Sequence, residues 1–252
     1  MPDTANIILI AEGTSDPRVA QGFAVRAIQE LDSFADWSWV QWRGLEQNTD
    51  FLPWQRVKTL AQEKRIMARG RFRDADLQVI DAEEKAVEVR KALHLCDHFF
   101  EDLGQPLAVI LFFDSDGRKY RFTGADQARV AHKAEYPIVV GMAHPCREAW
   151  LVGSFSAHTK PEEILLETLK QELSFHPCRQ PENLNTTAGH DRNAKIVLER
   201  LIGKSIEREK HLIATVLMSQ LQTHGKNCGL LEYLEEVQKH LAPLLGVSHD
   251  RG

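Results

Sequence analysis

Short, uninterrupted apolar runs mark the buried strands of this chain. They are NIILIAEG over residues 6–13, PLAVILFFDSDG over residues 106–117 and YPIVVGMA over residues 136–143, with WSWVQW over residues 37–42 as a further candidate. Strands that are apolar throughout, rather than at alternate positions, are typical of parallel sheets covered on both faces. The pattern therefore predicts a mostly parallel, four-stranded sheet flanked by helices.

Between these runs the apolar positions recur every three or four residues, which is the spacing of amphipathic helices. One such face follows the first strand and a longer one precedes the third; their residues are Val19, Phe23, Ala27 and Leu31, then Ala86, Val89, Leu93, Cys96, Phe100 and Leu103. We expect residues 52–104 to be mostly helical. Alternating strands and helices are typical of an α/β domain, which we place at residues 1–155, with residues 52–104 as a helical insertion.

The strand signals stop after about Gly153, and residues 156–252 are expected to form a helical C-terminal region. Helices are predicted over residues 164–173, 194–202, 206–222 and 230–245. The stretch over residues 174–193 is polar and rich in turn formers, so it is predicted to be a loop that separates the sheet from the C-terminal helices.

Composition and charge narrow the class of protein. The chain has 252 residues and a net charge of −5, so no overall positive field favours nucleic acid, although a local basic patch can coexist with it. Nothing approaches about 18 consecutive apolar residues, which argues against a membrane span. The four cysteines are widely separated without a CxxC pair, and the N-terminal apolar run is too short for a signal peptide. These features predict reduced thiols and a cytoplasmic protein.

Carboxylates follow the predicted strands at their carboxyl ends. Glu12 ends the first strand, Asp114 and Asp116 end the third, and Glu148 follows the last. Ligands of open parallel sheets bind at this edge. Carboxylates gathered there need a counter-charge, and a hard divalent cation such as Mg²⁺ supplies it through oxygen ligands. One alternative is that Asp-Ser-Asp-Gly only forms a turn. Likewise, AEGTSD could be only a tight strand-to-helix turn, with Asp16 near a helix N-cap.

The stretches ILIAEGTSD and ILFFDSDG, in this order and each at a strand end, resemble the Toprim superfamily of topoisomerases, primases and overcoming-lysogenization-defect nucleases. REAWLVG over residues 147–153, with a helical tail, resembles small stand-alone Toprim-like proteins found beside bacterial phage-defence genes. The resemblance implies that Asp114 and Asp116 hold Mg²⁺, with Mn²⁺ as a substitute, and that Glu12 completes the site or acts as general acid/base. Glu148 fits the extra acidic ligand of the nuclease-like branch.

Such a site favours hydrolysis of phosphodiester bonds, because a bound metal ion activates water and stabilises charge on a phosphoryl oxygen. Candidate residues for binding the substrate are Arg118 and Lys119 after the aspartates, Arg69, Arg71 and Arg73 in KRIMARGRFR, and Lys195. Basic side chains of this kind follow phosphates with little reading of sequence. The alternative for KRIMARGRFR is a solvated surface loop. His144 is a further candidate for contact with a phosphate.

The expected function is therefore a Mg²⁺-dependent nuclease acting on DNA or RNA in bacterial anti-phage defence. The resemblance alone implies a partner protein. Because the motif GxxxxGK[ST] does not occur in this chain, any control by ATP must come from such a partner, an ATPase. The C-terminal helices are candidates for forming a homo-oligomer. Two alternatives remain open: a non-catalytic sensor or interaction subunit of a defence complex, and a phosphohydrolase acting on small nucleotides.

Overall fold

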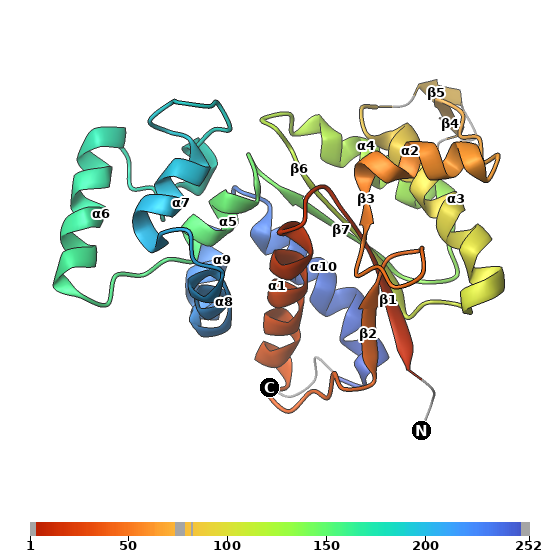
Figure 1. Cartoon of the computed structure of the whole chain (residues 1–252), viewed down its shortest axis with the longest axis horizontal. Coiled ribbons are helices and arrows are strands. Elements are labelled where there is room, and N and C mark those ends of the chain that lie inside the picture. The colour runs from red at the N-terminus through yellow and green to blue at the C-terminus, as the bar shows by residue number, and fades with distance from the viewer. Residues whose placement is uncertain (1–3, 74–78, 82, 248–252) are drawn as a thin grey trace.

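A five-stranded parallel sheet forms the centre of the molecule in a computed structural model that describes residues 4–73, 79–81 and 83–247 (Figure 1). Its strands are β1 (Ala5–Ala11), β2 (Val40–Arg43), β3 (Leu52–Pro53), β6 (Ala108–Asp114) and β7 (Ile138–Ala143). The order is β2-β1-β6-β7, with β3 pairing with β1 beyond the end of β2. The predicted α/β fold is confirmed, and the two-residue strand β3 adds a fifth strand to the four predicted.

Both faces of the sheet are buried, as the continuous apolar runs indicate. Along β1, Ile7 and Leu9 belong to one hydrophobic cluster, whereas Ile8 and Ile10 belong to another. Successive side chains of a strand point to opposite faces, so the two clusters are the two sides of the sheet. Every residue of β6 before Asp114 is fully buried. The central strand β6 is therefore apolar at every position before Asp114, because neither of its sides meets water.

The two faces are covered by different helices. Helices α1 (Asp16–Leu31) and α10 (Leu230–Leu241) supply the first cluster, and α2 (Trp54–Glu63), α3 (Ala86–Leu103) and α4 (Tyr120–His132) supply the second. In Figure 1, α2, α3 and α4 lie together on one side of the strands, and α1 and α10 on the other. Connections of parallel strands are right-handed, so β1-α1-β2 and β6-α4-β7, which progress in opposite directions across the sheet, place their helices on opposite faces.

The stretch over residues 52–104 is not purely helical. Besides α2 and α3 it contains β3 and an antiparallel pair, β4 (Arg71–Arg73) with β5 (Val79–Asp81). The basic sequence around β4 carries no apolar periodicity, so the pairing that makes it a strand is not visible in the pattern. The alternative of a surface loop for KRIMARGRFR therefore holds for residues 66–70 and not for Arg71–Arg73.

Beyond β7 the chain is helical. The elements are α5 (Arg147–Gly153), α6 (Lys160–Leu173), α7 (Ala194–Ile202), α8 (Ile206–Thr215), α9 (Met218–His224) and α10, with 3-10 turns at Pro181–Asn183 and Pro243–Leu245. The helix expected over residues 206–222 is two helices, because Val216 and Leu217 have extended backbones. Within the described residues, no helix combines the length and apolar character needed to cross a bilayer.

The last helix packs directly onto the sheet. Tyr233 of α10 is fully buried, and its hydroxyl donates a hydrogen bond to the carbonyl oxygen of Ala20 in α1 at 2.8 Å. Its ring lies over Gly141 of β7, where an added Cβ would come within 2.7 Å of the Tyr233 ring. Trp150 of α5 stacks on the same ring, with centroids 5.3 Å apart. Helices α10 and α5 are thereby fixed against the strand that ends beside the acidic residues.

Candidate active site at the carboxyl edge of the sheet

The predicted acidic residues lie where the connections between strands reverse direction across the sheet. From β1 the chain crosses to β2 on one side, and from β6 it crosses to β7 on the other, while β1 and β6 pair with each other. The carboxyl ends of β1 and β6 therefore form a topological switch point, where open α/β sheets bind ligands. Glu12 directly follows β1, and Asp114 is the last residue of β6. The fold thus brings these two carboxylates to the same edge of the sheet.

Asp114 is the centre of the acidic group. Its Oδ1 accepts a hydrogen bond from the backbone N–H of Arg147, the first residue of α5, at 2.9 Å. Burial raises the pKa of Asp114 well above its usual value, and the negative charges of Asp16, Glu12 and Glu148 raise it further. Such mutual influence requires the four carboxylates to be near neighbours.

Asp16 is an acidic residue of this group that the sequence analysis assigned differently. Ser15 holds the N-cap position of α1 and Asp16 is the first residue of the helix, so Asp16 lies next to the N-cap, as the alternative interpretation expected. Its carboxylate also accepts a hydrogen bond from the N–H of Gly13 at 2.6 Å and lies 3.1 Å from Nε of Arg147. Burial raises the pKa of Asp16. The AEGTSD turn therefore carries two carboxylates to this edge rather than one.

Glu12 lies between two buried cations. Its Oε1 is 3.2 Å from Nη2 of Arg121 and 3.8 Å from Nζ of Lys85. Burial nevertheless raises the pKa of Glu12, against the lowering effect of Lys85 and Arg121. The side chain of Lys85 is only 3% exposed, with Nζ 2.8 Å from Glu88 and 3.9 Å from the centre of the Trp54 ring. Burial lowers the pKa of Lys85.

Asp116 takes a different direction from Asp114. Its backbone has a φ of 49°, in the left-handed region, and its exposed carboxylate lies 2.8 Å from Nη1 of Arg121 and 3.6 Å from Arg118. Nη1 of Arg121 also donates to the carbonyl oxygen of Asp114 at 2.5 Å. Arg121 therefore connects the two aspartates and Glu12. Across the described residues, no three of Glu12, Asp114, Asp116 and Glu148 have oxygens within 4.8 Å of one another.

Arginine side chains supply the positive charge at this edge, and two of them keep unused donors. Arg147 pairs with Asp16 and also with Glu148, whose Oε1 is 3.1 Å from its Nη2. Nε of Arg121 and Nη1 of Arg147 are buried without a hydrogen-bond acceptor within the described residues. Each faces a carboxylate at 3.9 Å, which is Glu84 for Arg121 and Glu209 for Arg147. Buried donors are rarely left unpaired, so a small movement would let each donate either to that carboxylate or to an oxygen outside this chain, such as a phosphate oxygen.

The predicted substrate-binding residues are spread over three places. Arg118 lies at the edge, with Nη1 2.7 Å from Oε1 of Glu84, and Lys119 is exposed at the start of α4. Arg69 and Arg71 are exposed around β4, which packs against α4; the side chain of Arg73 lies outside the described residues. Lys195 is exposed in the first turn of α7, which packs on α5 and α6. No described interaction joins Lys195 to the acidic residues.

His144 connects the two loops that form this edge. Its Nδ1 lies 2.7 Å from Oγ of Ser115, and the backbone N–H of Asp116 donates to the carbonyl oxygen of Pro145 at 3.0 Å. Burial lowers the pKa of His144, so the imidazole is held toward its neutral form. We infer that His144 orients the Asp-Ser-Asp-Gly loop.

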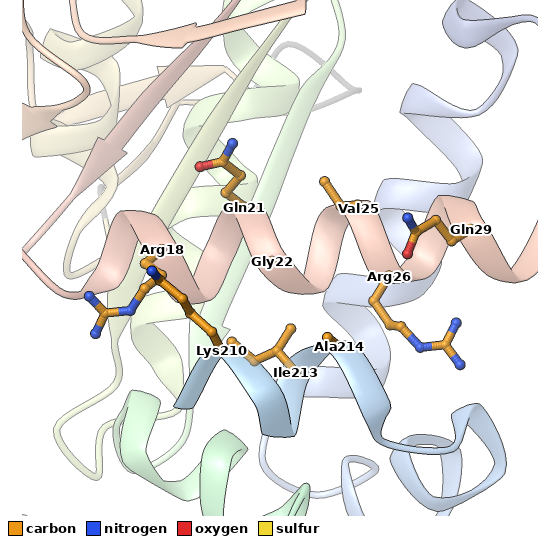
Figure 2. Close-up of a pocket in the computed structure, with 9 residues that line it drawn as sticks. All are labelled: Arg18, Gln21, Gly22, Val25, Arg26, Gln29, Lys210, Ile213 and Ala214. Carbon is orange, nitrogen blue, oxygen red and sulfur yellow. The ribbon is translucent and has the colours of Figure 1, made fainter. Parts of the chain in front are cut away.

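Two cavities adjoin this edge. One of about 460 Å³ is lined by Glu84, Lys85, Glu88, Lys58 and Lys91 on the α3 side. The other, of about 360 Å³, opens between α1 and α8 and is drawn in Figure 2. Its basic side chains already have partners, since Arg18 lies 2.5 Å from Glu209 and Lys210 lies 2.9 Å from Glu207. Of the two, the first is lined by a residue that contacts Glu12, because Nζ of Lys85 lies 3.8 Å from Oε1 of Glu12.

Comparison of the chain with family models, with curated proteins and with solved structures found no match. The resemblance to the Toprim superfamily accordingly stays a prediction from the two strand-end motifs. The parallel sheet and the switch point are observations of the structure and do not depend on it.

Proposed function

We propose that this chain is a metal-dependent nuclease that hydrolyses phosphodiester bonds of DNA or RNA at the carboxyl edge of its sheet. The observation that supports it most is the position of Glu12 and Asp114 at the switch point between β1 and β6. Asp16 and Glu148 lie so near that their charges raise the pKa of Asp114. Partly buried carboxylates that raise one another's pKa, at the edge where parallel sheets bind ligands, are typical of a functional site such as a cation site.

The donor set fits Mg²⁺, or Mn²⁺ in its place. Carboxylate oxygens are the ligands of hard divalent cations. No three of the acidic side chains have oxygens within 4.8 Å of one another among the described residues, so Asp114, Glu12 and Glu148 would move closer together to hold the ion, and Asp116 would join them after release from Arg121. When bound, the ion would polarise a phosphoryl oxygen and acidify a bound water molecule. Burial raises the pKa of Glu12, which favours its use as a proton acceptor and donor for water. Arg121 and Arg147, with their unused donors, would bind phosphate oxygens, and Arg118 and Lys119 would hold the neighbouring backbone.

The remaining parts of the proposal come from the resemblance and the sequence pattern. They are a cytoplasmic location, a role in bacterial anti-phage defence, a partner protein such as an ATPase and association of chains through the C-terminal helices. They are separable from the chemistry, because the cleavage assay needs only the purified chain.

A non-catalytic subunit is the second candidate function, and a specific observation favours it. Arg121, Lys85 and Arg147 already supply counter-charges to the carboxylates. An acidic edge balanced in this way is stable without a metal ion, so it is compatible with a sensor or interaction module. A phosphohydrolase acting on small nucleotides would use the same residues as the nuclease.

A cleavage assay with a matched variant separates these functions. The purified chain is incubated with single- and double-stranded DNA, RNA and mononucleotides, in Mg²⁺, in Mn²⁺ and in EDTA. We expect cleavage of nucleic acid that requires the metal ion and falls at least 100-fold in Asp114→Asn. The control is Glu167→Gln, an exposed carboxylate paired only with Lys170, which should cleave like the parent. Cleavage of mononucleotides alone would support the phosphohydrolase, and metal-independent or absent cleavage with intact folding would refute the nuclease.

A further inference from the structure

A second group of metal-ligating side chains lies on the face of the sheet covered by α3 and α4. His94 and Asp97 are one turn apart on α3, and His132 is the last residue of α4. One ligand atom from each lies within 4.8 Å of the other two, and within the described residues this is the only group of three His, Cys, Asp or Glu side chains with that property. Arg121 lies in the first turn of α4, so the group is at the opposite end of that helix from the acidic edge.

The separations of the three ligand atoms approach those of a tetrahedral site. Oδ2 of Asp97 lies 3.1 Å from Nε2 of His132 and 3.8 Å from Nδ1 of His94. Ligands at 2.0–2.1 Å from a tetrahedral ion are about 3.3 Å apart. Small adjustments of exposed side chains would therefore complete the arrangement. A fourth position would remain for water or another ligand.

The surroundings orient these ligands. The hydroxyl of Tyr136 donates a hydrogen bond to Oδ1 of Asp97 at 2.9 Å and lies 3.4 Å from Nε2 of His132, so it holds both side chains in place. Metal ligands are typically held in this way by outer hydrogen bonds. The side chain of His132 is 4% exposed, whereas those of His94 and Asp97 are 37% and 47% exposed. An ion can thus reach the group from solvent and rest against a buried imidazole.

An ordinary ion pair explains only part of this arrangement. One carboxylate needs one protonated imidazole as a partner, and Asp97 already has His132. The second imidazole, of His94, lies edge-on to the first with ring centroids 5.1 Å apart. Two imidazoles converging on one carboxylate from different helices are typical of a metal centre with two histidines and one carboxylate.

We propose that His94, Asp97 and His132 bind a transition-metal ion of the Zn²⁺ class that holds α3 against α4. Imidazole nitrogen selects such ions over Mg²⁺, which prefers oxygen ligands. The two helices are also those that bring cations to Glu12, through Lys85 before α3 and Arg121 in α4. The ion would therefore stabilise the packing of α3 against α4, the two helices beside Glu12, without contacting the acidic residues themselves. This proposal does not depend on the nuclease activity.

Titration with Co²⁺, a spectroscopic substitute for Zn²⁺, tests the site directly. Metal-free protein is titrated in excess Mg²⁺, so that oxygen-only sites are already filled, and binding is followed by visible absorption and by displacement with Zn²⁺. We expect one ion per chain, an absorption band typical of tetrahedral Co²⁺, and a higher melting temperature in Zn²⁺.

Three variants make the result specific. His94→Gln and Asp97→Asn remove ligands at partly exposed positions, where folding should be unaffected, and should each weaken binding at least tenfold. The control is His98→Gln on the same helix, whose imidazole packs against Phe99 and which should bind like the parent. The proposal is overturned if the parent takes up no Co²⁺, if both ligand variants keep its affinity, or if His98→Gln loses as much as they do.

Discussion

Replacing Asp114 by Asn should make the metal-free protein more stable while it removes the proposed activity. The wild-type carboxylate is buried among Asp16, Glu12 and Glu148, which raise its pKa. Asparagine has nearly the same shape but no charge, so it relieves both the burial of the charge and the repulsion. A stabilising substitution at a functional position is the signature of a site held for chemistry rather than for folding.

The magnitude follows from two opposing effects. Asn still accepts the hydrogen bond from the N–H of Arg147, but loss of the charge weakens it by about 1 kcal/mol. Each pKa unit by which folding raises the carboxyl is worth about 1.4 kcal/mol in the opposite direction. Because the pKa of Asp114 is raised well above its usual value, the second effect is larger. We expect a net gain on the order of 1 kcal/mol at pH 7, or about 2–4 °C in melting temperature.

The pH dependence gives the reasoning a sharper test. A carboxyl with a raised pKa binds its proton more tightly in the folded state, so its stabilising contribution is present below the unfolded pKa of about 3.9 and lost as pH rises through the folded pKa. The advantage of Asp114→Asn should therefore grow from pH 4 to pH 7. Urea denaturation in EDTA measures it, with Glu167→Gln as the exposed control.

Two outcomes would refute this account. A variant less stable than the parent at pH 7 would mean that the carboxylate is net stabilising, as in a structural ion pair with Arg147. A difference that does not change with pH would mean that the pKa of Asp114 is not raised. Added Mg²⁺ should stabilise the parent and not the variant, since only the parent keeps the full carboxylate set.

Other substitutions test separate parts of the structure. Gly141→Ala should lower the free energy of unfolding by about 1–3 kcal/mol, because its methyl group would lie 2.7 Å from the Tyr233 ring. The control is Gly203→Ala, at an uncrowded position with a positive φ. Denaturation of the two variants side by side separates the effect of overpacking from that of backbone strain. Lys85→Met should raise the pKa of Glu12 further, since Lys85 is the largest influence that lowers it, and should move the acidic limb of the pH–rate profile to higher pH. An unchanged limb would exclude Glu12 as the titrating group.

The apolar runs predicted the sheet because burial on both faces leaves polar residues in β1, β6 and β7 only near the strand ends, at Asn6 and Asp114. They also predicted that Glu12 and Asp114 meet, since the carboxyl ends of parallel strands share an edge. Asp116 could not be placed in the same way. The direction of its side chain depends on its left-handed backbone and on the ion pair with Arg121. Neither can be predicted from the two-residue spacing of the aspartates at the end of a strand.

The positions of Lys85 and Arg147 beside the acidic residues could not be predicted from the sequence for a related reason. Lys85 belongs to the long insertion and Arg147 to the start of α5, and only packing brings them to Glu12 and Asp16. The pair His94 and Asp97 could have been noticed from its one-turn spacing on a helix. Its third member, His132, is on another helix, and no local pattern shows which turns of α3 and α4 face each other.

Tyr233 ties the end of the chain to its beginning, and this has a consequence for biosynthesis. The surface of β7 that α10 covers stays open to water until α10, which is translated much later, packs against it. The hydroxyl of Tyr233 then donates its hydrogen bond to the carbonyl oxygen of Ala20. A nascent chain that has completed the strands and α5 still lacks the Tyr233 ring that packs on Phe112 and Trp150. Truncation before Leu230 should therefore yield an aggregating fragment rather than a smaller working protein.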